Sequence, residues 1–157
     1  MIIESTESLR SWVQIPPAAS QPKVRVDVNS GLYQLVVKLK ETRVITVGRH
    51  GRYSFPAGYY VYTGSAMQGL ESRIARHLRK TKRMRWHIDY LVQYGQIIAV
   101  KRYCNGLSEC KLNGMVEKLP GSRIIAQGFG SSDCRCSTHL FHFQRNPAQE
   151  LCQKQVG

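Results

Sequence analysis

The chain has 157 residues, of which 42% are hydrophobic and 21% are charged, the size and composition of one globular domain with its own core. Its apolar runs are only a few residues long, so we expect no transmembrane segment, which needs roughly 20 apolar residues. Lys and Arg number 23 against 10 Asp and Glu, a net charge of +13. This excess favours polyanionic partners, nucleic acid first and an anionic membrane surface second.

Residues 1–22 are expected to form an N-terminal extension, because they include Pro16-Pro17, which blocks regular structure. The segment has neither the basic start nor the apolar stretch of a secretory signal. We therefore expect an intracellular, cytoplasmic protein, with the nucleoid as a location compatible with its charge. In a reducing compartment, the five cysteines are not expected to form a disulfide framework.

Residues 23–145 predict one small domain of the α/β (α+β) class, with a central antiparallel or mixed sheet flanked by helices. Its first half is rich in β-favouring and turn-forming residues. These predict a strand at 31–39, its hairpin partner at 43–47, a turn-rich stretch at 48–58 and a third strand at 59–63, stopped by Gly64.

The second half alternates between helical and strand periodicity. Its first helix is predicted from one apolar face, formed by Leu70, Ile74, His77 and Leu78. The next elements are predicted to be a helix at 86–94, a strand at 96–103, a helix at 108–119 capped by Ser108, and late strands at 123–126 and 138–143. Residues 146–157 are expected to be a polar C-terminal tail.

Basic residues cluster in and after the first predicted helix. Seven cations fall within residues 73–85, and no acid lies between Glu71 and Asp89. A merely solvated helix face usually carries interspersed acids, which are missing here. The cluster predicts contact with a phosphate backbone, made by Arg76, Arg79, Lys80, Lys82, Arg83 and Arg85.

Two tyrosine motifs precede this basic helix, Gly31-Leu32-Tyr33 and Tyr62-Thr63-Gly64. If their strands pair, both tyrosines lie near the start of the helix that carries Arg73. A tyrosine whose pKa is lowered by nearby cations can act as a base or position water, and an arginine neutralises phosphate oxygens. One carboxylate can hold Mg²⁺ or Mn²⁺ with phosphate as a co-ligand. These are the parts that phosphodiester hydrolysis needs.

These residues resemble the GIY-YIG nucleases, with the two tyrosine motifs in order and Leu70-Glu71-Ser72-Arg73 similar to the helix of that family. The resemblance implies catalytic roles for Tyr33, Tyr62 and Arg73. It also implies a metal-binding glutamate on a later helix, for which Glu109 is the first candidate and Glu117 the second.

Within that family the chain looks most like the DUF123 subgroup, over about residues 31–143. The long motifs that carry this match lie at 58–66, 86–91 and 128–136. Two departures matter. Tyr33 and Tyr62 are 29 positions apart, which implies an inserted hairpin, and the late asparagine of the family has no equivalent. The turn with Ser132 and Asp133 is expected to stand in its place.

Three further features leave alternatives open. His77 lies on the apolar face of its helix and is expected to be packed there, within reach of the site. For His87 two roles remain open. It is either a structural residue, or an accessory residue of the site that can also contact nucleic acid. Cys134, Cys136 and His139 have the donors of a zinc site, completed by Cys110 or Cys104, but reduced, packed cysteines are favoured over zinc.

The leading hypothesis is thus a metal-dependent endonuclease with Mg²⁺ or Mn²⁺ as cofactor. Resemblance alone favours DNA over RNA. The first alternative is a non-catalytic nucleic-acid-binding module with the same fold, and the second is a membrane-surface or protein-interaction module.

Overall fold

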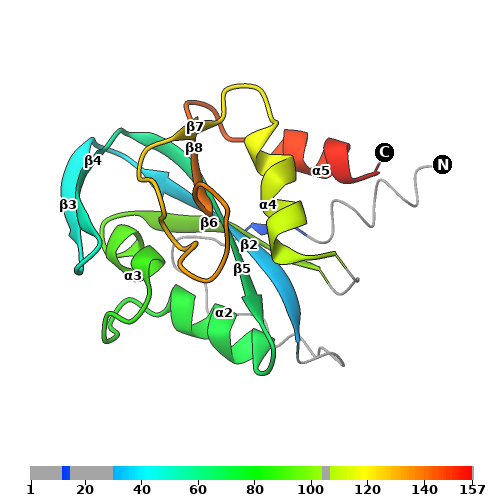
Figure 1. The fold of residues 1–157 in the computed structure, drawn as a ribbon, viewed down its shortest axis with the longest axis horizontal. Helices are drawn as coiled ribbons and strands as arrows, with labels where there is room; N and C mark the ends of the chain where they lie inside the picture. The colour runs from blue at the N-terminus through cyan, green and yellow to red at the C-terminus, as the bar shows by residue number, and fades with distance from the viewer. Residues whose placement is uncertain (1–11, 15–29, 104–106, 157) are drawn as a thin grey trace.

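An antiparallel sheet forms the centre of the protein. The computed structural model describes residues 12–14, 30–103 and 107–156, and within them six strands pair in the order β1-β6-β2-β5-β8-β7 (Figure 1). The strands are β1 (Trp12–Gln14), β2 (Gly31–Leu39), β5 (Gly58–Ala66), β6 (Gln96–Tyr103), β7 (Arg123–Ile124) and β8 (Leu140–Phe143). The predicted fold class, a small domain with a central antiparallel sheet flanked by helices, is confirmed.

The central pair of strands is β2 and β5. β2 is buried at six consecutive positions, 32–37, because the sheet is covered on both faces, which favours a continuous apolar run over alternation. The register aligns Tyr33 with Gly64 and Leu35 with Tyr62. Since β5 continues through Gly64 to Ala66, this glycine does not end the strand as predicted.

A separate hairpin lies between the two central strands in sequence. The strand β3 (Arg43–Val47) pairs with β4 (Gly51–Phe55), not with β2 as the sequence analysis expected. Both edges of β2 are occupied by β5 and β6, so 43–47 has no place beside it. The hairpin implied by the long spacing between the tyrosines is present in the stretch interpreted as turns.

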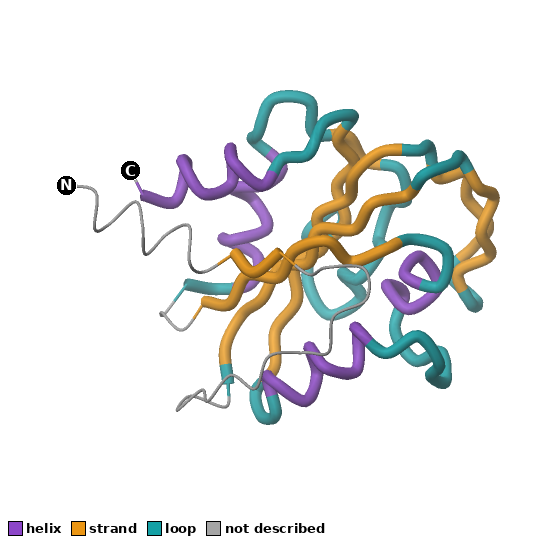
Figure 2. Tube along the Cα trace, turned by 180° about the vertical axis from the view of Figure 1, so that it is seen from behind, coloured by secondary structure: helices purple, strands orange, loops and turns teal. Residues whose placement is uncertain are grey.

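The two largest apolar clusters cover opposite faces of the sheet. Figure 1 shows α2 (Leu70–Leu78) and α3 (His87–Val92) at its lower left, and α4 (Glu109–Glu117) and α5 (Ala148–Val156) at its upper right. The larger cluster joins Leu35, Ile74 and Leu91 with the β3–β4 hairpin. The smaller joins Val36 with α4 and α5. Figure 2 shows the same layers from behind.

Both ends of the chain contain regular structure that the sequence analysis did not predict. Part of the predicted N-terminal extension is β1, which pairs with β6 at the edge of the sheet. The predicted polar tail contains α5, whose Leu151 and Cys152 are buried in the smaller cluster. Among the described residues, none of the helices is long and apolar enough to cross a membrane.

Candidate functional site

The two tyrosines lie side by side on adjacent strands. Tyr33 is 2% exposed and Tyr62 is 9% exposed, and their ring centroids are 6.4 Å apart. The ring of Tyr33 lies over Gly64, where an added Cβ would come within 2.6 Å of the phenol Cζ and oxygen. The glycine of the second motif is therefore required by the tyrosine of the first.

A second glycine makes room for Tyr62. Gly130 has a φ of +70°, in the left-handed region that favours glycine, and a Cβ there would come within 2.9 Å of Tyr62 Cε1. Gly130 belongs to the loop between β7 and β8, one of the long motifs noted in the sequence. Its position explains why that loop reaches the tyrosine pair.

His77 is buried beside Tyr33, in the last turn of α2. Its Nε2 is 2.8 Å from the Tyr33 hydroxyl, and its Nδ1 is 4.0 Å from Asp89 Oδ1. Burial, reinforced by the nearby cations and only partly offset by Asp89, lowers the pKa of His77 to about 3. The imidazole is therefore neutral at physiological pH, and its Nε2 can accept a hydrogen bond from the Tyr33 hydroxyl.

Arg73 and Glu109 reach the tyrosines from opposite layers and share one partner, Ser65. Arg73 on α2 donates to the Ser65 carbonyl. The Ser65 hydroxyl donates to Glu109 Oε1 at 2.7 Å, at the first position of α4. Ser108 caps that helix as predicted, accepting from the Lys111 N–H. The end of β5 thus holds both charged groups in place.

The Glu109 carboxylate is kept ionised by its neighbours. Its Oε2 lies 3.1 Å from His139 Nδ1. Burial alone would raise the pKa of Glu109, but hydrogen bonds from His139 and Ser65 and the charge of Arg73 outweigh it and lower the pKa. Glu117, the second candidate, is exposed at the far end of α4, about 12 Å along the helix axis.

One expectation about the tyrosines is wrong. Burial raises the pKa of both hydroxyls above their ordinary value, and Arg73, which acts in the opposite direction, does not compensate. Desolvation exceeds the effect of a single guanidinium because both rings sit in the core. Neither tyrosine is a ready phenolate, so each is a neutral hydroxyl that donates and accepts hydrogen bonds.

These groups open onto one cleft of about 230 Å³. The residues predicted as site or accessory positions that line it are Tyr33, Tyr62, Arg73, Arg85, His87, Glu109, Ser132 and Asp133. A larger cleft, of about 340 Å³, lies beside Lys38, Lys40 and Arg43. We regard the smaller cleft as the candidate site because hydroxyls, a guanidinium and a carboxylate converge there.

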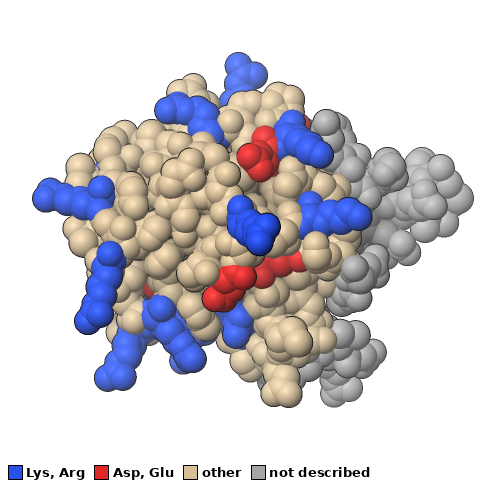
Figure 3. All heavy atoms as spheres, in the orientation of Figure 1, with Lys and Arg blue, Asp and Glu red and all other residues tan. Residues whose placement is uncertain are grey.

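The predicted phosphate-binding residues separate into two sets. Arg76 is bound to Asp89 through two hydrogen bonds of 3.0 Å, and Lys82 donates to the carbonyls of Arg76 and His77 at the end of α2. Both cations hold α2 in place. The exposed cations of the cluster are Arg79, Lys80, Arg83 and Arg85, and Figure 3 shows basic side chains at the lower left of this face, over the α2–α3 region.

His87 connects the cleft to the inserted hairpin. Its Nδ1 accepts the Gly130 N–H at 2.9 Å, and its ring stacks on His50 at 4.5 Å between centroids. His50 Nε2 is in turn 2.8 Å from the Gln127 carbonyl. His87 therefore positions the β7–β8 loop while lining the cleft.

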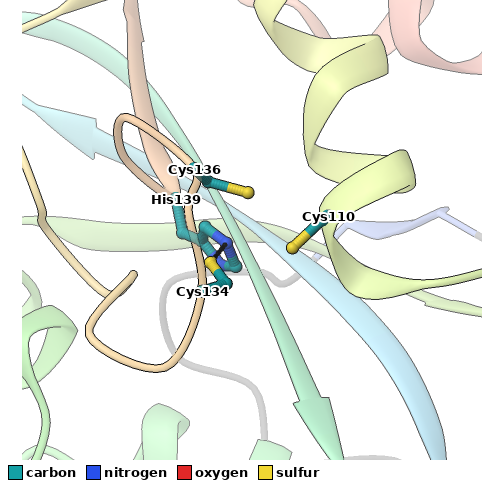
Figure 4. A group of neighbouring side chains, drawn as sticks. All are labelled: Cys110, Cys134, Cys136 and His139. Carbon is teal, nitrogen blue, oxygen red and sulfur yellow. Dashed lines mark hydrogen bonds between the residues drawn. The ribbon is translucent and has the colours of Figure 1, made fainter.

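Cys110, Cys134, Cys136 and His139 come together next to the cleft (Figure 4). One donor atom from each lies within 4.8 Å of the others, so the group can hold a metal ion. The sequence analysis identified three of the four and left the fourth open between Cys110 and Cys104. Cys104 lies outside the described residues.

Sequence reasoning assigned no role to three residues that shape the site. Ser65 joins Arg73 to Glu109, and Asp89 accepts the backbone N–H groups of Arg85 and Trp86. The Trp86 ring packs under the guanidinium of Arg73 at 4.8 Å and that of Arg85 at 5.2 Å. In the sequence, the one indication of their importance was that they lie inside the long motifs at 58–66 and 86–91.

Comparison with known proteins gives one match. A family model described as Domain of unknown function DUF123 matches residues 32–157, which includes every residue that lines the cleft. Neither a curated protein nor a solved structure matches the chain.

Proposed function

We propose that this chain, which belongs to the DUF123 family, is a metal-dependent endonuclease of the GIY-YIG type that hydrolyses phosphodiester bonds, with DNA as its favoured substrate. One observation carries the proposal. Tyr33, Tyr62, Arg73 and Glu109 come from four separate elements and line the same cleft. Packing in the main cluster accounts for the positions of the two tyrosines, but it does not require an arginine and a glutamate beside them.

Tyr33 and His77 position the attacking water. The Tyr33 hydroxyl donates a hydrogen bond to His77 Nε2, 2.8 Å away, which leaves the Tyr33 oxygen free to accept a hydrogen bond from the water. The raised pKa of Tyr33 makes a phenolate unfavourable, so Tyr33 acts as a neutral hydroxyl that orients the water. Tyr62, beside it, orients the water through its neutral hydroxyl.

Arg73 stabilises charge on the transferring phosphoryl group. One of its N–H groups is used by the Ser65 carbonyl, and a guanidinium carries five in a planar fork. The Trp86 ring under the guanidinium fixes its plane. The remaining donors are thus held at the cleft for phosphate oxygens.

Glu109 fits the role of ligand for Mg²⁺ or Mn²⁺. Each of its oxygens accepts one hydrogen bond, from Ser65 or His139, and a carboxylate has about four lone-pair sites. A hard cation that keeps most of its water needs one such carboxylate and substrate phosphate. When bound, it would stabilise the leaving oxygen and the phosphoryl charge.

The exposed cations provide the binding surface for nucleic acid. Lys80 lines the larger basic cleft, together with Lys38 and Arg43, and Arg85 lies at the candidate site. A strand bound across both would make several phosphate contacts. Affinity is then expected to fall steeply as salt concentration rises.

The test is single-turnover cleavage of labelled single- and double-stranded DNA and RNA by the full chain, with Mg²⁺, Mn²⁺ or EDTA. We expect metal-dependent cleavage that Arg73→Ala reduces by about 100-fold or more, since its contact strengthens as charge develops in the transition state. Lys80→Ala is the matched control, expected to weaken binding by about one phosphate contact.

The non-catalytic binding module is the second candidate, favoured by one observation, the raised pKa of both tyrosines. It predicts salt-dependent binding without cleavage in any metal. Equal effects of Arg73→Ala and Lys80→Ala on binding, with no cleavage by the parent protein, would establish it over the nuclease.

A further inference from the structure

The cysteine and histidine cluster beside the cleft has the donors of a soft-metal site. Cys110 lies in the first turn of α4, and Cys134, Cys136 and His139 lie in the loop before β8. In Figure 4 the Cys110 sulfur points from the helix toward the three loop residues. Their donor atoms lie within 4.8 Å of one another, against about 3.8 Å for thiolates around a tetrahedral zinc ion.

We propose that Cys110, Cys134, Cys136 and His139 bind one Zn²⁺, as a Cys₃His site separate from the hard-metal ligand Glu109. Three sulfurs and an imidazole nitrogen are the ligands of structural zinc sites. Mg²⁺ and Mn²⁺ prefer oxygen donors, so the two sites are expected to select different metals.

The surroundings of the three cysteines argue against ordinary hydrophobic packing. Cys110 is exposed, and Cys134 and Cys136 are half-buried. Cys152, in contrast, is buried in the apolar cluster under α5. Cysteines that pack as small hydrophobic residues are usually buried in that way. A metal ion bound by all four residues would explain why three partly exposed thiols converge on one imidazole.

His139 has the hydrogen-bonding pattern of a zinc ligand. Its Nε2 faces the Cys134 sulfur at 3.3 Å, while Nδ1 lies 3.1 Å from Glu109 Oε2 and 3.2 Å from the Thr63 carbonyl. A zinc-bound histidine usually donates its other N–H to a carboxylate or carbonyl. Nε2 is therefore assigned to the metal and Nδ1–H to those oxygens.

This pattern gives the zinc site a positioning role toward the candidate active site. The metal would join α4 to the loop that supplies Gly130, Ser132 and Asp133 to the cleft. It would also fix His139 against Glu109. This second consequence rests on the proposed function, whereas zinc binding itself does not.

The first experiment measures metal content. The full chain is purified under reducing conditions without chelators, and metals are quantified by mass spectrometry. We expect one zinc per chain, and on Co²⁺ substitution the absorption bands of a tetrahedral thiolate site. Cys110→Ser should weaken zinc binding by at least about 100-fold, while the matched control Cys152→Ala should keep the full stoichiometry.

The metal analysis can either overturn or support the zinc site. Absence of stoichiometric zinc even after addition of Zn²⁺, or equal zinc in the parent and in both Cys110→Ser and Cys136→Ser, overturns the proposal. Cys136→His keeps a zinc ligand, and its retention of zinc supports the site even if a serine variant fails to fold.

The second experiment tests the positioning role by cleavage at varied Mn²⁺ concentrations. In Cys110→Ser we expect a higher Mn²⁺ concentration for half-maximal cleavage than in Cys152→Ala. An unchanged Mn²⁺ dependence refutes the positioning role. Zinc binding without cleavage by the parent protein refutes the proposed function and leaves the zinc site standing.

Discussion

Buried, neutral His77 makes the stability of the protein sensitive to mild acid. The side chain is 1% exposed and faces Tyr33, Asp89 and the ring of Trp86. Its pKa is about 3 in the folded protein, against an ordinary value of 6.5. Between these values the unfolded chain binds a proton that the folded chain does not, so acidification favours unfolding.

The magnitude follows from the two pKa values. Each unit of difference corresponds to about 1.4 kcal/mol. Lowering the pH from 7 to 5 is therefore expected to reduce the free energy of unfolding by about 2 kcal/mol through His77 alone. This figure depends on the unfolded pKa of 6.5 and hardly on the folded value, provided that the folded value stays below about 4.

The assay is urea unfolding at pH 7 and pH 5 for the parent and for His77→Phe. The phenyl ring keeps a flat side chain in place but cannot be protonated. It leaves the Tyr33 hydroxyl without this partner and lowers stability at both pH values. The readout is the change in the free energy of unfolding between pH 7 and pH 5. Burial also lowers the pKa values of His87 and His142, but these residues contribute equally to that change in both proteins.

We expect the parent to lose about 2 kcal/mol more than His77→Phe between these pH values. If both proteins lose the same free energy, His77 is not held neutral by the fold. The hydrogen bond from the Tyr33 hydroxyl to His77 would then also lack its acceptor.

Two further predictions concern the site. Gly64→Ala should lower stability by about 1–3 kcal/mol, measured by urea unfolding, because its Cβ would meet Tyr33 at 2.6 Å; Gly114→Ala, with nothing within 4 Å, should be neutral or stabilising by up to about 1 kcal/mol. Glu109→Gln should abolish metal-dependent cleavage and leave nucleic-acid affinity equal or higher, whereas Glu117→Gln should cleave normally; the reverse result in cleavage and binding assays would reassign the ligand.

Local pattern was sufficient for much of the fold. The strands at 31–39 and 96–103 and the Ser108 cap are encoded by β-favouring runs and a hydroxyl before a helix. The tyrosine pair was predictable because both motifs lie on strands. The partner of 43–47 was not predictable, since pairing depends on which edges of β2 other strands occupy.

The partners of the charged residues and the pKa values of the site could not be predicted, because they depend on packing between residues far apart in the sequence. Arg76 looked like a phosphate ligand until Asp89, on another helix, was placed beside it. Likewise, the pKa of Tyr33 depends on burial by several elements, which outweighs the cation that the sequence places nearby. Cys110 joined the cluster for the same reason, since its distance to Cys134 is set by how α4 packs on β5.

The β2–β5 register has a consequence for how many residues can separate the two tyrosines in the sequence. Because Tyr33 and Tyr62 are fixed by cross-strand pairing, the segment between them acts as a closed loop whose length is nearly free. Doubling such a loop costs only about 0.6 kcal/mol of chain entropy. The β3–β4 hairpin offsets that cost by burying Ile45, Val47 and Phe55 in the main cluster. A search for similar sites should therefore leave the loop length open and require a glycine opposite the first tyrosine.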